Sequence, residues 1–155
     1  MAELTEVAGR LGGIPESDPQ ELNRIAWYLA IDPRFEPPVY AAAAEMATRA
    51  VGEVSDKEEV ALYANTLGVA LYRAGSHEEA IVELRRSDDL MEDQETGGLP
   101  HNSAFIAMSL HRLGRAGEAA NEYARLEQQM SQEQWAKDAE AVSFFNEARE
   151  LLGRE

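Results

Sequence analysis

Two stretches of the chain, Asn65–Leu84 and Ala104–Tyr123, carry the same pattern of small and apolar residues, 39 residues apart. They align without a gap: Leu67, Gly68, Leu71, Gly75, Ala80 and Leu84 correspond to Ile106, Ala107, Leu110, Gly114, Ala119 and Tyr123. Apolar residues at helical spacing on both sides of a glycine are typical of two helices joined by a tight turn. Such units bury their apolar faces by stacking on one another, so the repeat predicts an all-α array and favours a binding scaffold over an active site.

A degenerate copy of this unit precedes the two. Its first helix is predicted to start at Asp18–Glu21, where a capping carboxylate and a first-turn proline come before an apolar helical pattern. Ile31–Val39 contains three prolines and is predicted to be a loop, followed by a helix from about Val39 to Val51. The repeat positions are taken by Ile25, Ala26, Leu29, Ala43, Ala47 and Ala50. The insertion Asp32–Pro38 lengthens this turn by five residues, so the first unit is expected to pack differently.

Capping signals predict the remaining helix ends. Ser55, Ser76 and Ser131 each begin a capping box, in which the hydroxyl and a Glu or Gln three residues later satisfy free backbone N–H groups. Gly75 and Gly114 are predicted to end the helices before them, because a residue without a Cβ adopts the left-handed conformation at little cost.

The segment Glu92–Pro100 is acidic and contains two glycines, so it is predicted to be the most mobile internal loop. A final helix from Ser131 to about Leu152 is expected to cap the Ala104–Met130 pair. Its apolar stripe contains Trp135, Ala139, Val142, Phe144, Phe145, Ala148, Leu151 and Leu152. The chain 1–155 is then one domain with units at about 20–52, 56–92 and 100–130 and a capping helix at 131–152.

Charge and composition narrow the class of partner. The 155 residues include 14 Lys and Arg against 29 Asp and Glu, giving a formal charge of −15 that opposes binding to nucleic acid or an anionic membrane. The absence of cysteine removes disulfides, thiolate metal sites and cysteine nucleophiles. The start MAELTEVAGRLGG does not have the pattern of a secretory signal, and no run reaches the roughly 20 apolar residues of a membrane span. We expect a soluble, cytoplasmic protein or a soluble piece of a larger one.

The residues Asn65–Ile81 resemble the tetratricopeptide repeat, an antiparallel helix pair that stacks into a right-handed superhelix. In this family the two helices cross closely at small residues, a role that falls here to Gly68 and Ala80, and in the second copy to Ala107 and Ala119. More narrowly, LNRIAWYLA, LYANTLGVALYRAG and AFIAMSLHRLGR are similar to the tetratricopeptide tracts attached to bacterial serine/threonine kinases and WD40 proteins. That similarity implies an accessory module of a bacterial signalling protein. The chain itself has no glycine-rich phosphate loop, HRD or DFG triplet, so kinase activity does not reside here.

The resemblance also implies a binding site, because the first helix of each pair lines a concave groove in this family. The residues expected to face that groove are Asn23, Trp27, Asn65, Val69, Tyr72, Arg73, Met108, His111 and Arg112. Asparagines would pair with the backbone of an extended peptide, aromatic rings would pack on its apolar side chains, and Arg73 or Arg112 would take a carboxylate. The alternative is that Asn65 bonds a neighbouring helix and Trp27 belongs to the core. A complete carboxylate clamp is not expected, since Lys57 and Lys137 fall outside the groove.

Other candidate chemistries are weaker. His77-Glu78 does not form a zinc HExxH motif, because the second histidine position is Ile81. Asp88, Asp89, Glu92, Asp93 and Glu95 lack the alternating ligands and central glycine of a calcium loop. No metal or cofactor is therefore expected. We expect a non-catalytic, monomeric protein- or peptide-binding scaffold. The alternatives are self-association through the C-terminal helix or the first unit, and an enzyme whose site is assembled only in the fold.

Overall fold

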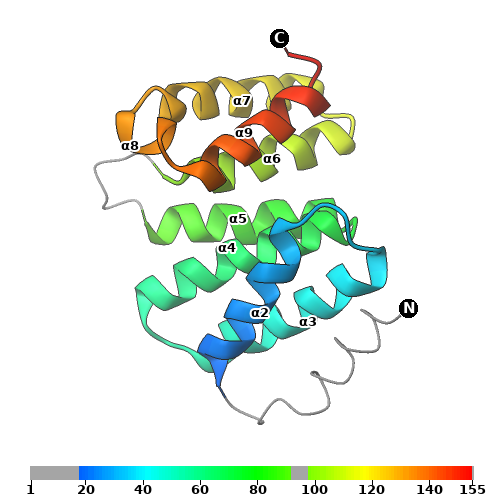
Figure 1. Ribbon diagram of the computed structural model, residues 1–155, viewed down its shortest axis with the longest axis vertical. Helices are drawn as coiled ribbons and strands as arrows, with labels where there is room; N and C mark the ends of the chain where they lie inside the picture. Colours follow the sequence, from blue (N-terminus) through cyan, green and yellow to red (C-terminus); the bar gives the residue numbers. More distant parts are fainter. Residues whose placement is uncertain (1–17, 92–97, 155) are drawn as a thin grey trace.

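The computed structural model describes residues 18–91 and 98–154, and the regular structure of these residues is entirely α-helical (Figure 1). The helices are α2 (Pro19–Ile31), α3 (Pro37–Glu53), α4 (Lys57–Arg73), α5 (His77–Leu90), α6 (Pro100–Arg112), α7 (Ala116–Met130), α8 (Glu133–Ala136) and α9 (Ala139–Leu151). The predicted all-α class is confirmed. Across the described residues, no helix combines the length and apolar character needed to cross a membrane.

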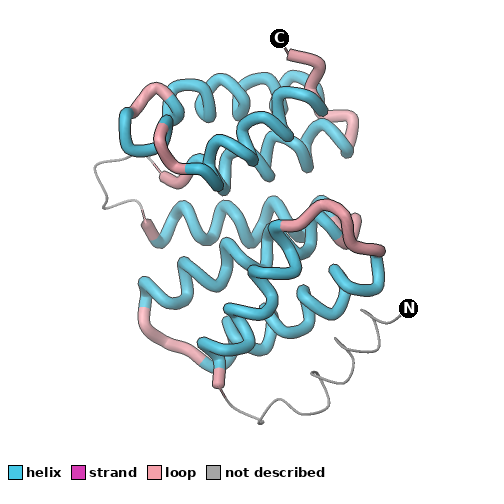
Figure 2. The backbone as a smooth tube through the Cα atoms, in the orientation of Figure 1, coloured by secondary structure: helices cyan, strands magenta, loops and turns pink. Residues whose placement is uncertain are grey.

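Six of these helices form three consecutive pairs, α2 with α3, α4 with α5 and α6 with α7, joined by short connections (Figure 2). Between pairs, the first helix packs mainly on the second helix of the preceding pair: α4 on α3, and α6 on α5. The first helices also contact one another in order, α2 with α4 and α4 with α6. The order of helices along the chain is therefore also their order in space.

Carboxylate caps set the start of α2 and α4. Asp18 Oδ1 accepts from the backbone N–H groups of Gln20 and Glu21 at 3.0 and 3.4 Å, as predicted. At α4 the cap is Asp56, which accepts from the backbone N–H groups at positions 58 and 59. The predicted cap at Ser55 is thus wrong by one residue, because a charged carboxylate interacts more favourably with the positive end of the helix dipole than a hydroxyl does.

The other two predicted capping boxes do not form, although the helix start predicted at Ser76 is confirmed. Ser76 occupies the N-cap of α5 without a side-chain capping bond, and Ser131 is the C-cap of α7. The single C-terminal helix expected from Ser131 is divided into α8 and α9. Asp138 starts α9 by accepting from the Ala141 N–H at 2.7 Å, so a stronger cap within the segment replaces the expected one.

The proline-rich connection is shorter than predicted, because α3 begins at Pro37 instead of Val39. Proline is tolerated in the first turn of a helix, where the backbone N–H has no intrahelical acceptor. The remaining loop, Asp32–Glu36, is held by Tyr40, whose hydroxyl donates to the Asp32 carbonyl at 2.6 Å and accepts from the Phe35 N–H at 3.0 Å. Part of the insertion therefore extends α3 and does not lengthen the turn.

Close crossings between helices depend on small residues, as predicted. A Cβ on Gly68 would lie 2.4 Å from Leu84 Cγ and 3.3 Å from the Ala80 carbonyl oxygen. The equivalent residues in the next pair, Ala107 and Ala119, are fully buried. Gly75 and Gly114 end α4 and α6 with φ of +88° and +75°, which confirms their predicted role.

The connection before α6 is only partly covered by the described residues. Residues 92–97 of the loop predicted to be mobile lie outside them. Its last residues are packed: Gly98 and Pro100 are buried, and a Cβ on Gly98 would lie 2.6 Å from Arg125 Nη2. Gly98 and Pro100 are therefore packed against the helices, and the mobility of the segment stays a prediction.

The C-terminal helix α9 packs on the last pair, but mainly on α6 and less on α7 (Figure 1). This placement differs from that of α4 and α6, which pack mainly on the second helix of the pair before them. The fully buried side chains of α9 are Ala141, Phe144 and Ala148, whereas Phe145 stacks on Tyr123 with 5.9 Å between ring centroids. The expected contact residues Trp135, Val142 and Leu152 are only partly buried.

Candidate functional site

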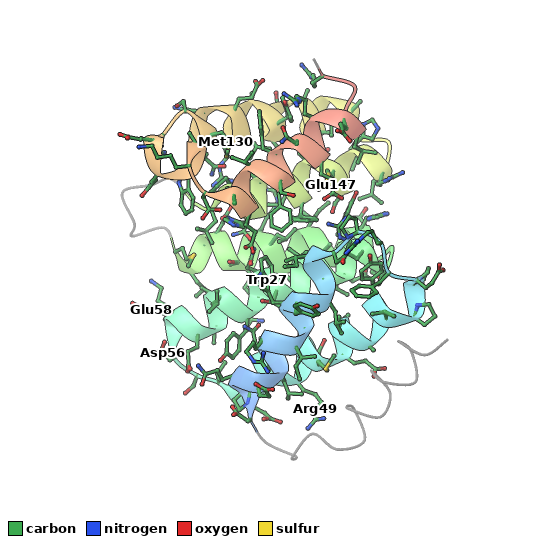
Figure 3. All side chains as sticks on the ribbon, in the orientation of Figure 1. Trp27, Arg49, Asp56, Glu58, Met130 and Glu147 are labelled. Atoms are coloured by element: carbon green, nitrogen blue, oxygen red, sulfur yellow. The ribbon has the colours of Figure 1, made fainter. Side chains whose placement is uncertain are left out.

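The surface formed by α2, α4, α6 and α9 is called the inner face here. In Figure 1 α2 and α9 are drawn in front, with α4 and α6 behind them. Figure 3 shows Trp27 on α2 and Glu147 on α9 on this side of the molecule. The four helices meet in sequence along this face, since α2 contacts α4, α4 contacts α6, and α6 contacts α9.

A pocket of about 510 Å³ opens on the inner face, between the N-terminal halves of these helices. It is lined by Gln20, Asn23, Arg24 and Trp27 of α2, by Glu59, Leu62, Tyr63, Asn65 and Thr66 of α4, and by Leu99, His101 and Glu140. Leu99 is the N-cap of α6, His101 lies in its first turn, and Glu140 lies in the first turn of α9. The pocket therefore collects side chains that are far apart in the sequence.

The structure brings three of the nine expected groove residues, Asn23, Trp27 and Asn65, to this pocket. Val69 and Met108 have no exposed surface and lie in the core. His111 and Arg112 are exposed at the end of α6, away from the residues that line the pocket. Three of the nine residues predicted from the first helices thus line the pocket, and the buried and distant ones do not.

Asn65 is buried and bonded to the neighbouring first helix, which was the alternative interpretation of this residue. Its Nδ2 donates to Asn102 Oδ1 at 2.7 Å, and Asn102 Nδ2 donates to Ser87 Oγ at 3.1 Å and to Asp88 Oδ1 at 2.7 Å. Arg125 Nη1 continues this polar network by donating to Asp88 Oδ2 at 3.0 Å. The network joins α4, α5, α6 and α7 beneath the pocket, so Asn65 forms part of its floor and its amide N–H is already used.

Arg73 is also engaged within the chain. Its Nε donates to the Ala30 carbonyl at 3.0 Å, and its guanidinium forms a two-point ion pair with Glu147, with Nη2 to Oε2 at 2.9 Å. The same guanidinium lies 5.2 Å from the centre of the Phe105 ring, and only 6% of the Arg73 side chain is exposed. Because the guanidinium of Arg73 already forms an ion pair with Glu147, it is not available to bind the carboxylate of a partner.

We call the region around Arg73 the closed half of the inner face. Here the end of α2, the end of α4 and the middle of α9 meet through Ala30, Arg73 and Glu147. Tyr72 lies in the same region, buried against Phe105 with 5.3 Å between ring centroids, and burial raises its pKa. Side chains of α9 therefore fill this half.

An aromatic cluster separates the closed half from the pocket. Phe144 of α9 packs edge-on against Phe105, Trp27 and His101, with ring centroids 4.8, 6.0 and 5.6 Å away. Trp27 is only partly buried, and its other side lines the pocket. Phe144 thus contacts two residues of the pocket lining, Trp27 and His101, from α9.

Two titratable groups in the pocket are shifted toward their neutral forms. Burial lowers the pKa of His101, against the opposing effect of Asp138. Burial raises the pKa of Glu140, which also accepts a hydrogen bond from Trp27 and lies near the negative charge of Asp138. His101 Nε2 is 3.4 Å from Glu140 Oε1, so the two groups share one wall of the pocket.

Two buried polar atoms at the pocket have no hydrogen-bond partner among the described residues, Asn23 Oδ1 and His101 Nδ1. A buried polar atom without a partner costs about 1–3 kcal/mol, so such atoms indicate bound water or a ligand. Asn23 was a predicted site residue, and its carbonyl oxygen is shielded from solvent.

Several pocket residues escaped the sequence analysis. Leu62, Tyr63 and Thr66 lie within one helical turn of Asn65, so extending the groove pattern toward the start of α4 would have found them. Glu140 had no such signal, because it belongs to a helix whose start was predicted at the wrong residue. His101 follows the buried Pro100 and had no distinguishing pattern.

In residues 18–91 and 98–154, no three histidine, aspartate or glutamate side chains are grouped to hold a metal ion. Asp88, one of the acidic residues considered for a cation, accepts from Asn102 and pairs with Arg125. Glu92, Asp93 and Glu95 lie outside the described residues. No family model, curated protein or solved structure matches this chain.

Proposed function

We propose that the chain is a tetratricopeptide-like array with a C-terminal capping helix, and that it binds a segment of another protein without catalysing a reaction. Three helix pairs in spatial order, with small residues at the Gly68 crossing, support the array, which in this family winds as a right-handed superhelix. A cytoplasmic, bacterial signalling protein is the setting we propose from the sequence resemblance alone.

The observation that carries this proposal is the pocket on the inner face. It combines partly buried Trp27, the buried ring of Tyr63 and the unpaired acceptor Asn23 Oδ1. A recess with apolar walls and a few polar groups that lack partners is the usual form of a recognition site. Leu62 at this pocket is 49% exposed, so it offers an apolar contact to a segment that enters the recess.

The alternatives have less support. The Thr66 hydroxyl in the pocket donates to the Leu62 carbonyl at 3.4 Å and not to a base, so it is not prepared as a nucleophile. The C-terminal helix, which was the candidate surface for self-association, uses Phe144 and Ala148 to pack on its own chain. Both features favour a monomeric binding protein.

The experiment uses peptides selected from a random displayed library against the purified chain, with binding measured by fluorescence anisotropy. Trp27→Ala should weaken binding by about tenfold or more, as expected for loss of an aromatic contact. Tyr28→Ala is the matched control, because Tyr28 is the next residue on α2 and is 69% exposed away from the pocket lining. Asn23→Leu is a second variant that leaves the contact between Trp27 and Phe144 intact.

Selected peptides that bind the folded Trp27→Ala and Asn23→Leu variants as tightly as the parent would place the binding surface outside the pocket. A library from which the chain enriches no peptide would contradict the proposed function itself.

A further inference from the structure

The lining of the pocket includes two carboxylates. They belong to Glu59 on α4 and Glu140 on α9. The Thr66 hydroxyl donates within its own helix, and Trp27 donates to Glu140. A ligand that matches this lining must therefore bring donors of its own.

The positive charge of the lining is already neutralised. The arginine of the lining is Arg24. Its Nε and Nη2 donate to the two carboxylate oxygens of Glu21 at 2.8 and 2.5 Å. Its side chain is 69% exposed, so it lies at the rim. His101 is buried, which lowers its pKa and favours its neutral form at neutral pH.

Further carboxylates surround the same space. Asp138 lies 3.9 Å from His101 Nε2, measured to Oδ1. Asp18 is close enough, together with Glu59, to raise the pKa of Tyr63 in addition to the effect of burial. The pocket thus combines a negative potential with the partly exposed ring of Trp27, which attracts cations through its face and packs on alkyl chains.

We propose that this pocket binds a cationic side chain, arginine or lysine, of the partner segment, with its N–H groups directed to Glu140 and Glu59. The alkyl part of that side chain packs on Trp27. This inference rests on the proposed function and specifies its partner: a segment with a basic residue at the anchoring position. It fits a chain whose formal charge is −15, because long-range attraction then speeds the encounter.

The peptide side of the test uses the sequences selected on the parent chain. Each basic residue of a selected peptide is replaced in turn by citrulline, a neutral isostere of arginine, or by norleucine where the residue is lysine. One of these replacements should weaken binding by about tenfold or more, and the others should have much smaller effects. Equal losses at every basic position would instead show nonspecific attraction to an acidic protein and would overturn the inference.

The protein side of the test is Glu140→Gln, which keeps the shape of the side chain and removes its charge. Glu150→Gln is the matched control, because Glu150 is an exposed carboxylate on the same helix and not part of the pocket. Both variants change the net charge equally. Glu140→Gln should weaken binding of the basic peptide by about tenfold and leave binding of its citrulline form unchanged. Equal effects of the two variants would contradict the inference.

The two proposals fail in different ways. If the selected peptides are sensitive to Trp27→Ala but contain no basic residue, or bind equally as citrulline forms, the proposed function stands and the cationic anchor is wrong. If they contain an essential basic residue yet are insensitive to Trp27→Ala and Asn23→Leu, the cation binds elsewhere, and the pocket is not the site.

Discussion

The two halves of the inner face are built from the same four helices but differ in what occupies them. Between the N-terminal halves of the helices lies a pocket of about 510 Å³, with Asn23 Oδ1 left without a partner. In the closed half, by contrast, the polar side chain of Arg73 is paired with Glu147 of the same chain. The face predicted from the repeat is thus half filled by α9 and half open.

This difference shows that the repeat pattern defines a surface, whereas the C-terminal helix determines which part of it is accessible. Because α9 packs mainly on α6, it reaches α2 and α4 through Phe144 and Glu147. A cap seated mainly on α7 would not make these contacts. The following predictions test how far the two halves are independent.

The largest effect is expected at Gly68, where α4, which contributes to both halves, crosses α5. Gly68→Leu places a side chain where even a Cβ would lie 2.4 Å from Leu84 Cγ, and overpacking of this kind costs about 3 kcal/mol. Thermal and urea unfolding should show that loss. Gly117→Ala is the control: it has no atom within 4 Å of a new Cβ, so it should stabilise α7 slightly. Equal stability of Gly68→Leu and the parent would contradict the crossing.

The next effect concerns the closed half alone. Glu147→Ala leaves the guanidinium of Arg73, which is 6% exposed, without its carboxylate. Removing one partner of a buried pair costs about 3–5 kcal/mol, and the 29% exposure of Glu147 reduces our expectation to about 2 kcal/mol. Glu150→Ala, an exposed change on the same helix, should have little effect in the same urea titration. If the folded Glu147→Ala variant keeps its affinity for selected peptides, the two halves are functionally separate.

Local and long-range features of the molecule differ in how well the sequence predicted them. The Asp18 cap, the glycine helix ends and the crossing at Gly68 follow from residues close in the chain, and these predictions were correct. The three serine capping boxes are equally local, yet they do not form. The pair of Arg73 with Glu147 joins side chains 74 positions apart, and no periodicity indicates which acidic residue reaches which arginine. Glu140 was missed for a local reason, because its position depends on Asp138, which starts α9.

A smaller effect is expected from pH, through His101 of the pocket. Burial lowers its pKa, so the folded state binds a proton less readily than the unfolded state. The stabilisation is complete above the ordinary value of 6.5 and is lost as the pH falls below it. His101→Gln should reduce this loss in urea unfolding measured from pH 7 to pH 5. The exposed His111→Gln is the control, and an unchanged pH slope in His101→Gln would contradict the assignment.

The smallest effect on stability is expected at Leu62, which is 49% exposed beside the pocket. Leu62→Ser should change the free energy of unfolding by about 0.5 kcal/mol or less, as surface substitutions usually do. The same variant should weaken peptide binding, because it removes an apolar contact from the pocket. Val82→Ser, 63% exposed on α5, is the control for removal of an exposed apolar side chain. Equal peptide binding by both variants would remove Leu62 from the site.

The central claim, that a partner segment occupies the pocket while α9 stays in the closed half, is tested most directly by NMR. A selected peptide is titrated into the ¹⁵N-labelled chain, and side-chain and backbone shifts are followed. We predict large changes at the Trp27 indole, the Asn23 amide and the Glu140 backbone, with small changes at Arg73 and Glu147. Changes confined to the exposed residues Tyr28 and Val82, with the Trp27 indole unmoved, would contradict the account.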